Sequence, residues 1–362
     1  MRIGIIGAGQ LGQMLGFAAR DLDIQCSFID PSDAPPAAVT GDVIRRPFDD
    51  PDALQTLADE CDVVTYEFEN VPVEALLRIS DRVPVYPPPD ALRHAQDRLA
   101  EKRLFDSLQI PLPQYQAVDT LQDLQAAIDA IGLPLILKTR RLGYDGKGQF
   151  VVRSADDIDA AWRALGTQAL IAEEWVPFEY EVSAIGVRNV AGDIALYPLT
   201  QNEHVDGILR QSRAPVDAPE LTAIAEQYVK ALLSHLDYVG VLALELFVAG
   251  DRLLANEFAP RVHNSGHWTI EGAETSQFAN HLRAISNLPL GSTTCRGHVG
   301  MLNLIGEIPD AVRRPLEPGC WLHDYGKTPR EGRKLGHLTT VAASAEDRDR
   351  RLRLILDTLP KV

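Results

Sequence analysis

The feature that most constrains the fold is the alternation of apolar strands and amphipathic helices over the first 90 residues, opened by a glycine-spaced turn. The segment RIGIIGAGQLGQML runs from an apolar stretch through Gly7, Gly9 and Gly12 into residues with helical spacing. Further strands are predicted over QCSFID and DVVTYEFE, with a helix over PDALQTLADEC whose first turn contains Pro51. Alternation of this kind favours a doubly wound parallel sheet.

By itself, the glycine turn predicts a redox dinucleotide site. The spacing Gly7-x-Gly9-x-x-Gly12 lets the backbone approach a pyrophosphate. Asp30 ends the second strand about 20 residues further on, where a ribose-binding carboxylate is typical. An NAD-dependent dehydrogenase is therefore one functional alternative, and the rest of the chain must decide it.

Composition limits the partners and the compartment. The net charge is −16, which argues against nucleic acid and against an anionic membrane surface, and requires any anionic substrate to meet a local basic cluster. Cys26, Cys61, Cys295 and Cys320 form no CxxC pair, so we expect small buried thiols in a reducing compartment rather than disulfides or metal ligands. With no leader pattern at the N-terminus and no apolar run of about 20 residues, we expect a cytoplasmic protein.

The rest of the chain divides into segments that differ in their predicted secondary structure. After the proline-rich segment VPVYPPPDA, one helix capped by Asp90 is predicted over DALRHAQDRLAEKRLFDSLQ. A compact α+β unit follows at about 113–180, and then come two hairpins that turn at NVAGD and at Gly250-Asp251. We expect an α/β and α+β protein with a Rossmann-like domain at 1–95, a central domain at 96–294 that contains the small unit, and a small C-terminal domain at 295–362.

Two glutamates in the second hairpin suggest a metal site. Glu245 and Glu257 are nearly symmetric about Gly250-Asp251, within the apolar runs ALELF and ANEFA. The hairpin would bring them side by side, and opposed like charges are destabilising, the more so when buried. A hard divalent cation that bridges them would remove the repulsion. The alternative is a solvated sheet face.

A lysine followed by a glycine-rich loop suggests a polyphosphate site. Lys138 ends the apolar strand PLILK, just before the loop GYDGKGQ at 143–149. Three glycines let the backbone N–H groups of this loop approach a polyphosphate. It is not a Walker A loop, because GxxxxGK[ST] is absent from the chain. An ordinary hairpin turn with charged tips is the alternative.

A third segment is typical of an adenine-binding hinge. Glu173, Glu174 and Trp175 end a predicted strand shortly before Pro177. Backbone groups at such a strand end can bind an adenine edge, and Glu181 could accept hydrogen bonds from ribose hydroxyls. Surface acids are the commoner explanation of each residue taken singly.

These features, in this order, resemble the ATP-grasp superfamily. The segments GAGQLGQML, TYEFENVP, DRLAEKRLF, KTRRLGYDGKGQ, NEFAPRVHNSGHWTIEG and GKTPREGRKLGH resemble, from end to end, the N5-carboxyaminoimidazole ribonucleotide synthetases of purine synthesis. The resemblance implies an ATP-grasp fold with a Rossmann-like pre-ATP-grasp domain. It also implies that ATP phosphorylates bicarbonate to carboxyphosphate, whose carboxyl group passes to the amine of 5-aminoimidazole ribonucleotide. One or two Mg²⁺ ions, no redox cofactor and a homodimer are further implications.

The resemblance also assigns residues to sites. The ATP site would comprise Arg98, Lys138, Gly143, Tyr144, Asp145, Gly146, Lys147, Gly148, Gln149, Glu173, Glu174, Trp175, Val176, Glu181, His204, Asn256 and Glu257. The ribonucleotide would meet Gln10, Leu11, Glu67, Tyr144, Asp145, Lys147, Lys327, Arg333 and Lys334. Glu245 and Glu257 would hold Mg²⁺. Arg261, His263 and Asn264 would bind bicarbonate and carboxyphosphate, with His263 either orienting the amine or relaying a proton. Lys327 is a further catalytic residue in this assignment.

Alternatives remain at this point. The basic run KTPREGRK suits a phosphate dianion, although such clusters are often solvated faces. Many ATP-grasp ligases have asparagine at the position of Ala259, so the number of metal ions stays open. A formate-dependent glycinamide ribonucleotide transformylase is the near neighbour in function, and a non-catalytic nucleotide sensor is a third class. If the resemblance holds, the glycine turn lines the ribonucleotide pocket and Asp30 has no ribose to bind.

Overall fold

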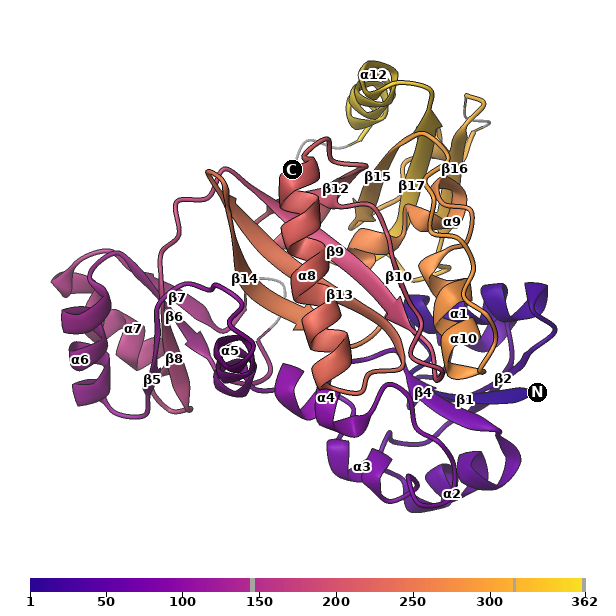
Figure 1. Cartoon of the computed structure of the whole chain (residues 1–362), viewed down its shortest axis with the longest axis horizontal. Helices are drawn as coiled ribbons and strands as arrows, with labels where there is room; N and C mark the ends of the chain where they lie inside the picture. Colours follow the sequence, from indigo (N-terminus) through magenta and orange to yellow (C-terminus); the bar gives the residue numbers. More distant parts are fainter. Residues whose placement is uncertain (144–146, 315–316, 360–362) are drawn as a thin grey trace.

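The computed structural model describes residues 1–143, 147–314 and 317–359, and its N-terminal part is the expected parallel sheet (Figure 1). In sheet order, its strands are β3 (Asp42–Ile44), β2 (Gln25–Ile29), β1 (Arg2–Ile6) and β4 (Val63–Tyr66), and every pair is parallel. Its helical segments are α1 (Gln10–Asp21), η1 (Pro36–Val39), α2 (Pro51–Glu60) and α3 (Val73–Leu77). The predicted parallel sheet is confirmed.

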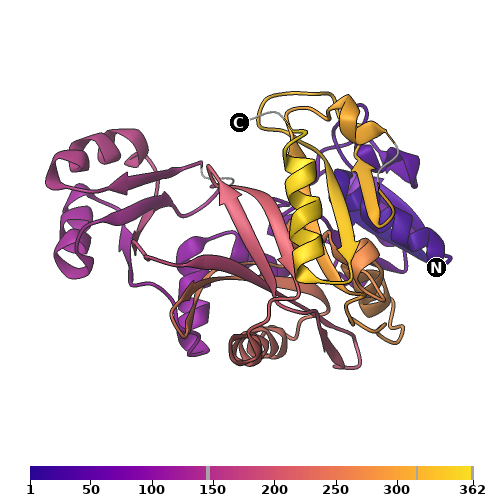
Figure 2. The same ribbon diagram turned by 90° about the horizontal axis from the view of Figure 1, so that it is seen from above.

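A small antiparallel sheet projects from one side of the molecule, at the left of Figures 1 and 2. In sheet order, its strands are β5 (Tyr115–Val118), β8 (Leu170–Glu174), β6 (Leu135–Thr139) and β7 (Gln149–Val152). Its helical segments are α6 (Leu121–Ile131), η2 (Ala155–Asp157) and α7 (Ile158–Leu165). The unit has an apolar core of its own, which includes Leu124, Leu135 and Leu170. Figures 1 and 2 show the unit beside the central sheet.

The largest layer is a nine-stranded antiparallel sheet. Its path runs β14 (Arg252–Ala259), β13 (Gly240–Ala249), β9 (Tyr180–Arg188), β11 (Thr200–Val205), β12 (Ile208–Ala214), β15 (His298–Ile305), β17 (Lys334–Ala342) and β16 (Cys320–Asp324), with β10 (Ile194–Leu196) paired to β9. Because β12 pairs with β15, the sheet is continuous across residue 294. The C-terminal residues therefore extend the central sheet.

Helices cover this sheet and join it to the N-terminal part. Helix α8 (Pro219–His235) packs against β9, β13 and β14, and α12 (Ala345–Leu356) packs against β15 and β17. Helix α10 (Gln277–Ile285) packs against β9 and β13 and also against α1. The remaining short segments are η3 (Asn264–Gly266), α9 (Thr269–Gly272) and α11 (Asp310–Arg313). Through α10, the N-terminal sheet and the central sheet share one apolar core.

The single helix expected over 90–109 is wrong, because the structure has two helices, α4 (Pro89–Ala95) and α5 (Arg98–Ser107). Asp97 caps α5, accepting hydrogen bonds from Leu99 N at 3.0 Å and Ala100 N at 3.3 Å. Between the two helices, Gln96 Nε2 donates hydrogen bonds to the carbonyls of Glu69 and Val71, and these bonds hold the α4–α5 bend in place. Asp90, the expected cap, lies in the first turn of α4 instead. The break places Arg98 at the first position of α5.

The structure can be compared with two expectations from composition, which concern membrane-spanning segments and the state of the cysteines. Over the described ranges, no helix is both long enough and apolar enough to cross a bilayer. All four cysteines are free thiols; Cys26 and Cys61 are buried as expected, whereas Cys295 and Cys320 are only partly buried.

Candidate active site

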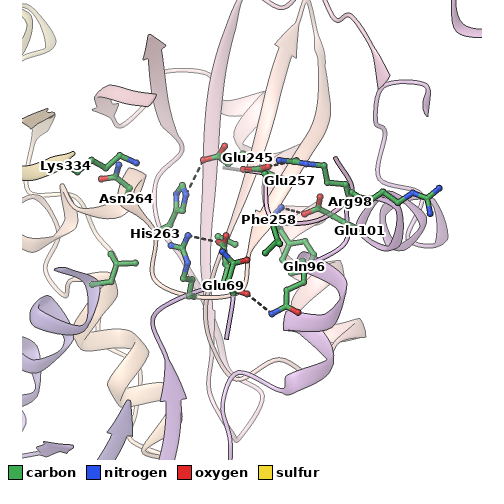
Figure 3. Close-up of a pocket in the computed structure, with 18 of the residues that line it drawn as sticks. Glu69, Gln96, Arg98, Glu101, Glu245, Glu257, Phe258, His263, Asn264 and Lys334 are labelled. Carbon is green, nitrogen blue, oxygen red and sulfur yellow. Dashed lines mark hydrogen bonds and ion pairs between the residues drawn. The ribbon is translucent and has the colours of Figure 1, made fainter. Parts of the chain in front are cut away.

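A cavity of about 220 Å³ opens where the three parts of the fold meet (Figure 3). The N-terminal part contributes Gln10, Leu11 and Glu69, and the α4–α5 bend contributes Gln96 and Arg98. The central sheet and its following loop contribute Glu245, Glu257, Arg261, His263 and Asn264, and β17 contributes Lys334. Charged and amide side chains dominate this lining, which suits a charged ligand.

The two hairpin glutamates face each other in this cavity. Glu245 on β13 and Glu257 on β14 are directly opposite in the strand register, and the chain turns at Gly250 between them, so the predicted juxtaposition is confirmed. Arg98 Nη1 lies 2.9 Å from Glu257 Oε2, and His263 Nε2 lies 3.4 Å from Glu245 Oε1 (Figure 3). Each carboxylate thus has a nitrogen partner on its outer side.

The pair shares its charge unequally. Burial and the charge of Glu257 raise the pKa of Glu245 to about 8. Burial also opposes ionisation of Glu257, but Arg98 outweighs it and lowers the pKa of that carboxyl. The opposite pKa shifts favour a protonated Glu245 beside an ionised Glu257, and a cation between them would favour ionisation of both.

The donor set fits magnesium. In the part of the chain that the structure describes, no three His, Cys, Asp or Glu side chains are arranged to hold a metal by themselves. Mg²⁺ is usually bound by one or two carboxylates together with waters and substrate phosphates. Two opposed carboxylates that repel each other therefore fit an ion whose other ligands come from a nucleotide.

Behind the glutamates, the small sheet contributes a buried lysine. Lys138 Nζ on β6 donates to Glu173 Oε2 on β8 at 2.8 Å. Burial lowers the pKa of Lys138. Burial opposes ionisation of Glu173 as well, but Lys102 and Lys138 lower its pKa to about 2. Glu173 Oε1 is buried and has no hydrogen-bond partner among the described residues.

The expected hinge follows β8 directly. Glu174 Oε2 accepts a hydrogen bond from Gln114 N at 3.1 Å, and the Val176 carbonyl accepts one from Phe178 N at 3.0 Å. Trp175 is 39% exposed, with the guanidinium of Arg153 lying 5.6 Å from its ring centroid. The segment therefore connects the small sheet to β9 and makes a tight turn at Pro177.

Glu181 and His204 lie together on the central sheet, as their shared assignment requires. Glu181 is on β9 and His204 on the adjacent β11, and their side chains are hydrogen-bonded. Burial opposes protonation of His204, but the bond to Glu181 and the charge of Glu245 raise its pKa. The raised pKa favours the protonated form of His204 in the neighbourhood of Glu245.

The segment after β14 forms a corner of the cavity with hydrogen-bond donors suited to an anion. Arg261 Nη2 lies 2.6 Å from Glu69 Oε1, and its Nη1 donates to the carbonyl of Val262 at 2.9 Å. Neither amide atom of Asn264 has a hydrogen-bond partner within the described ranges, although both are buried. A guanidinium bound to a carboxylate beside an unpartnered amide suits a small planar anion.

His263 is neutral and its tautomer is defined. Its Nδ1 accepts a hydrogen bond from Ser265 N at 3.3 Å, so the hydrogen lies on Nε2, which faces Glu245. Burial, with Arg261 and Lys334 nearby, holds the pKa of His263 well below its usual range. At neutral pH this imidazole is therefore a hydrogen-bond donor toward the cavity.

The glycine turn is filled by a carboxylate of the protein. Gly9 N donates to Glu67 Oε1 at 3.0 Å, and a Cβ at Gly7, where φ is +100°, would lie 2.6 Å from the same oxygen. Asp30 Oδ2 accepts a hydrogen bond from Ala8 N at 2.9 Å. The N–H groups of Ala8 and Gly9 thus donate to carboxylates of the protein itself, and this arrangement argues against the dinucleotide alternative.

The basic C-terminal segment reaches the N-terminal domain. Lys327 Nζ donates to Gln10 Oε1 and lies 5.7 Å from the ring centroid of Tyr325. Burial and the charge of Arg333 lower the pKa of Lys327 to about 8. Lys334 lines the cavity, whereas Arg333 donates to the carbonyl of Thr328 at 3.1 Å and is not among the lining residues. The cluster is thus divided between the cavity and its rim.

The glycine loop is only partly described. Gly143 lines the cavity, and Gln149 begins β7 opposite Lys138. The Gly148 carbonyl accepts a hydrogen bond from Thr139 N at 2.8 Å. Lys147 precedes it, and Tyr144, Asp145 and Gly146 lie outside the described residues. Their assignments stay predictions.

Glu69 is a cavity residue that the sequence interpretation missed. It follows β4 and binds the guanidinium of Arg261. A signal was available, because ligands of open parallel sheets bind beyond the carboxyl ends of the strands, and Glu69 lies two residues after Glu67 at such an end. Asn256 is placed on β14, where its carbonyl accepts a hydrogen bond from Lys102.

Comparisons with known proteins agree along the whole chain. Family models match residues 1–96 as a ribonucleotide synthetase preATP-grasp domain, 103–278 as an ATP-grasp domain, and 300–351 as a phosphoribosylaminoimidazole carboxylase C-terminal domain. The N5-carboxyaminoimidazole ribonucleotide synthases of Pseudomonas aeruginosa and Brucella melitensis are 51% and 46% identical, with 95% of both chains covered for the first and 94% and 96% for the second.

Solved structures agree with these matches. The N5-carboxyaminoimidazole ribonucleotide synthetase of Thermus thermophilus superimposes with a TM-score of 0.95 at 48% identity, over 99% of both chains. The Aspergillus clavatus N5-carboxyaminoimidazole synthase, solved with ADP and 5-aminoimidazole ribonucleotide, has a TM-score of 0.91 at 32% identity, over 99% of this chain and 98% of that one. The expected ATP-grasp fold is confirmed.

Proposed function

The chain belongs to the N5-carboxyaminoimidazole ribonucleotide synthase family, and from this premise we propose how its cavity performs the reaction. It is an ATP-dependent ligase of purine biosynthesis that carboxylates 5-aminoimidazole ribonucleotide. The observation that supports the site assignment most strongly is the opposed pair Glu245 and Glu257 in the wall of a polar cavity. The steps below assign roles to the residues around that pair.

Glu245 and Glu257 would hold Mg²⁺, with the remaining ligands supplied by ATP and water. When bound, the ion neutralises charge on the phosphates during transfer of the γ-phosphoryl group. Arg98 already binds Glu257 and has further N–H groups for a phosphate oxygen. Lys138, buried beside Glu173, offers a second fixed cation. The strand passage from Glu173 to Val176 binds the adenine edge.

Bicarbonate binds at Arg261. The guanidinium already binds one planar carboxylate, that of Glu69, at 2.6 Å, and bicarbonate has the same fork of oxygens. The unpartnered amide of Asn264 and the Nε2–H of His263 supply further donors. None of these groups is a nucleophile that would compete for the γ-phosphoryl group, so a bicarbonate oxygen attacks it and ADP leaves.

The ribonucleotide binds on the opposite side of the cavity, between the N-terminal domain and the basic segment. Gln10 and Leu11 begin α1 at the cavity wall, and Lys327 reaches Gln10 from the C-terminal part. Lys327 and Lys334 supply positive charge for the phosphate of the ribonucleotide. Its amine nitrogen attacks the carboxyl carbon of carboxyphosphate, and phosphate leaves and takes up the proton that the amine loses. His263, as a neutral donor, orients the reacting carboxyl group.

The test is ADP release with each co-substrate omitted in turn. With ATP, Mg²⁺, bicarbonate and 5-aminoimidazole ribonucleotide present, ADP and the carboxylated product should form in equal amounts. Removal of bicarbonate from the buffer should abolish ADP release. Formate with glycinamide ribonucleotide should not replace the two substrates, which separates this enzyme from the transformylase. ATP binding without ADP formation under the full conditions would indicate a nucleotide sensor and contradict the proposal.

Two expectations concern the whole molecule. The homodimer that the resemblance implies and the cytoplasmic location expected from the sequence pattern stay predictions. Analytical ultracentrifugation at micromolar concentration checks the first, and fractionation of the native host checks the second.

A further inference from the structure

Side chains of helix α5 form hydrogen bonds with the backbone on both sides of Glu257. Arg98, Glu101 and Lys102 lie at i, i+3 and i+4 on one face of the helix, and that face meets β14. Glu101 Oε1 accepts a hydrogen bond from Phe258 N at 2.7 Å (Figure 3), and Lys102 Nζ donates to the carbonyl of Asn256 at 2.6 Å. One helix therefore holds the residue before Glu257, the residue after it, and its carboxylate.

A β-bulge makes the Asn256 carbonyl available for this contact. Glu245 pairs with Glu257 but Leu246 pairs with Ala255, so Asn256 is an extra residue on β14. A bulged residue is left out of the strand ladder and re-aims the side chains next to it. Glu257 is the neighbour in this case, so the direction of its carboxylate depends on how the bulge is held.

Lys102 also joins this strand to the small sheet. Its side chain is 0% exposed, and its ammonium lies 3.5 Å from Glu173 Oε2, the oxygen that also binds Lys138. It is not among the residues that line the cavity. A buried ammonium is costly unless it is paired, and well-packed apolar side chains often replace such groups without loss of stability. Its contacts suggest a role in geometry.

We propose that Lys102 is a positioning residue: its hydrogen bond to the Asn256 carbonyl fixes the bulge and thereby the direction of the Glu257 carboxylate toward the metal. Its ion pair with Glu173 also fixes Lys138, which binds the same Glu173 oxygen, relative to Glu257. It acts through these groups and touches no substrate. The inference rests on the proposed role of Glu257 as a metal ligand. This positioning role explains why α5 keeps a buried ammonium at Lys102, although Lys102 does not line the cavity.

The test compares Lys102→Met with Lys230→Met. Methionine keeps much of the lysine volume and removes the ammonium. Lys230 lies on α8 and is half-exposed, with only a surface pair to Glu226, so its replacement is a matched control. The readouts are the affinity for ADP by calorimetry, with and without Mg²⁺, and kcat and KM for the ribonucleotide.

Loss of a group that orients a metal ligand typically costs about 10–100-fold in metal affinity or activity. We expect Lys102→Met to reduce the Mg²⁺-dependent gain in ADP affinity about tenfold and to lower kcat, with KM for the ribonucleotide unchanged. Lys230→Met should match the wild type. A variant that loses kcat but keeps the wild-type Mg²⁺ dependence would overturn the proposal, as would one with unchanged kcat.

Two further variants keep the result interpretable. If Lys102→Met does not fold, Lys102→Gln is measured in the same way, because glutamine is polar and smaller, and the same loss of Mg²⁺ dependence is required of it. Glu257→Gln tests the premise. If it leaves the Mg²⁺ dependence intact, the metal assignment fails; if it removes that dependence while Lys102→Met and Lys102→Gln do not reduce it, only the positioning role fails.

Discussion

The buried histidine His281 makes the link between the N-terminal and central domains sensitive to acid. Its ring is 0% exposed, on α10. Nδ1 accepts a hydrogen bond from Val241 N on β13 at 3.1 Å, so Nε2 carries the hydrogen and donates it to Thr65 Oγ1 on β4 at 3.0 Å. Burial lowers the pKa of this imidazole to about 3. Only the neutral form can make both bonds.

The size of the effect follows from linkage. An exposed histidine in the unfolded chain has a pKa of about 6.5. Between that pH and the folded pKa of about 3, the unfolded chain binds a proton that the folded chain does not. The contribution to stability is therefore complete above pH 6.5 and is lost as the pH falls, by about 1.4 kcal/mol per pH unit. From pH 7 to pH 5 the loss amounts to about 2 kcal/mol.

The assay is urea unfolding of the wild type and His281→Gln at pH 7 and pH 5. The variant has no imidazole at this position, so its free energy of unfolding should fall by about 2 kcal/mol less between the two pH values. Burial also lowers the pKa of His263, His267 and His337, and both proteins share these groups, so their effect cancels in the difference. Equal losses in the two proteins, or a His281 resonance that titrates near pH 6.5, would refute the reasoning.

Four shorter predictions concern the site. Glu257→Gln should lower the rate of ADP release by at least about 100-fold through lost Mg²⁺ binding, and near-normal release would contradict the metal assignment. Arg261→Ala should spare the affinity for ADP, measured by calorimetry, while it abolishes carboxylation; equal losses in both would show that the anion corner is misplaced. Since the Lys327 pKa is about 8, its charge is present below that pH and lost above it, so KM for the ribonucleotide should rise above pH 8 in the wild type. Gly7→Ala should destabilise the fold by about 1–3 kcal/mol in urea unfolding, because of its φ of +100°.

The hairpin pair is the part of the site that local pattern could predict well. Glu245 and Glu257 are nearly symmetric about a turn, and a two-residue side-chain period then decides which residues share a face. The side-chain period could not predict the bulge at Asn256, because its carbonyl is bound by Lys102, more than 150 residues earlier in the chain. The pattern thus predicted that Glu245 and Glu257 pair, and missed the bulge that orients the Glu257 side chain.

The wrong helix and the rejected dinucleotide alternative have the same origin. The apolar spacing over 90–109 suits one helix, and the break comes from Gln96, which bonds to backbone carbonyls more than 20 residues away. The glycine turn has the local form of a dinucleotide site, and Glu67, 58 residues beyond Gly9, fills it. In both places a distant partner competes with a correct local signal.

By itself, the sequence determined the order of strands and helices, the glutamate hairpin and the basic segment, because these depend on side-chain periodicity and turn residues within about 20 positions. Only the tertiary structure decided the ionisation of the cavity: a raised pKa for Glu245, a neutral His263 with its hydrogen on Nε2, and a lowered pKa for Lys327. The physical reason is that burial and charge proximity depend on which distant segments the folded chain brings together, and protonation responds to both.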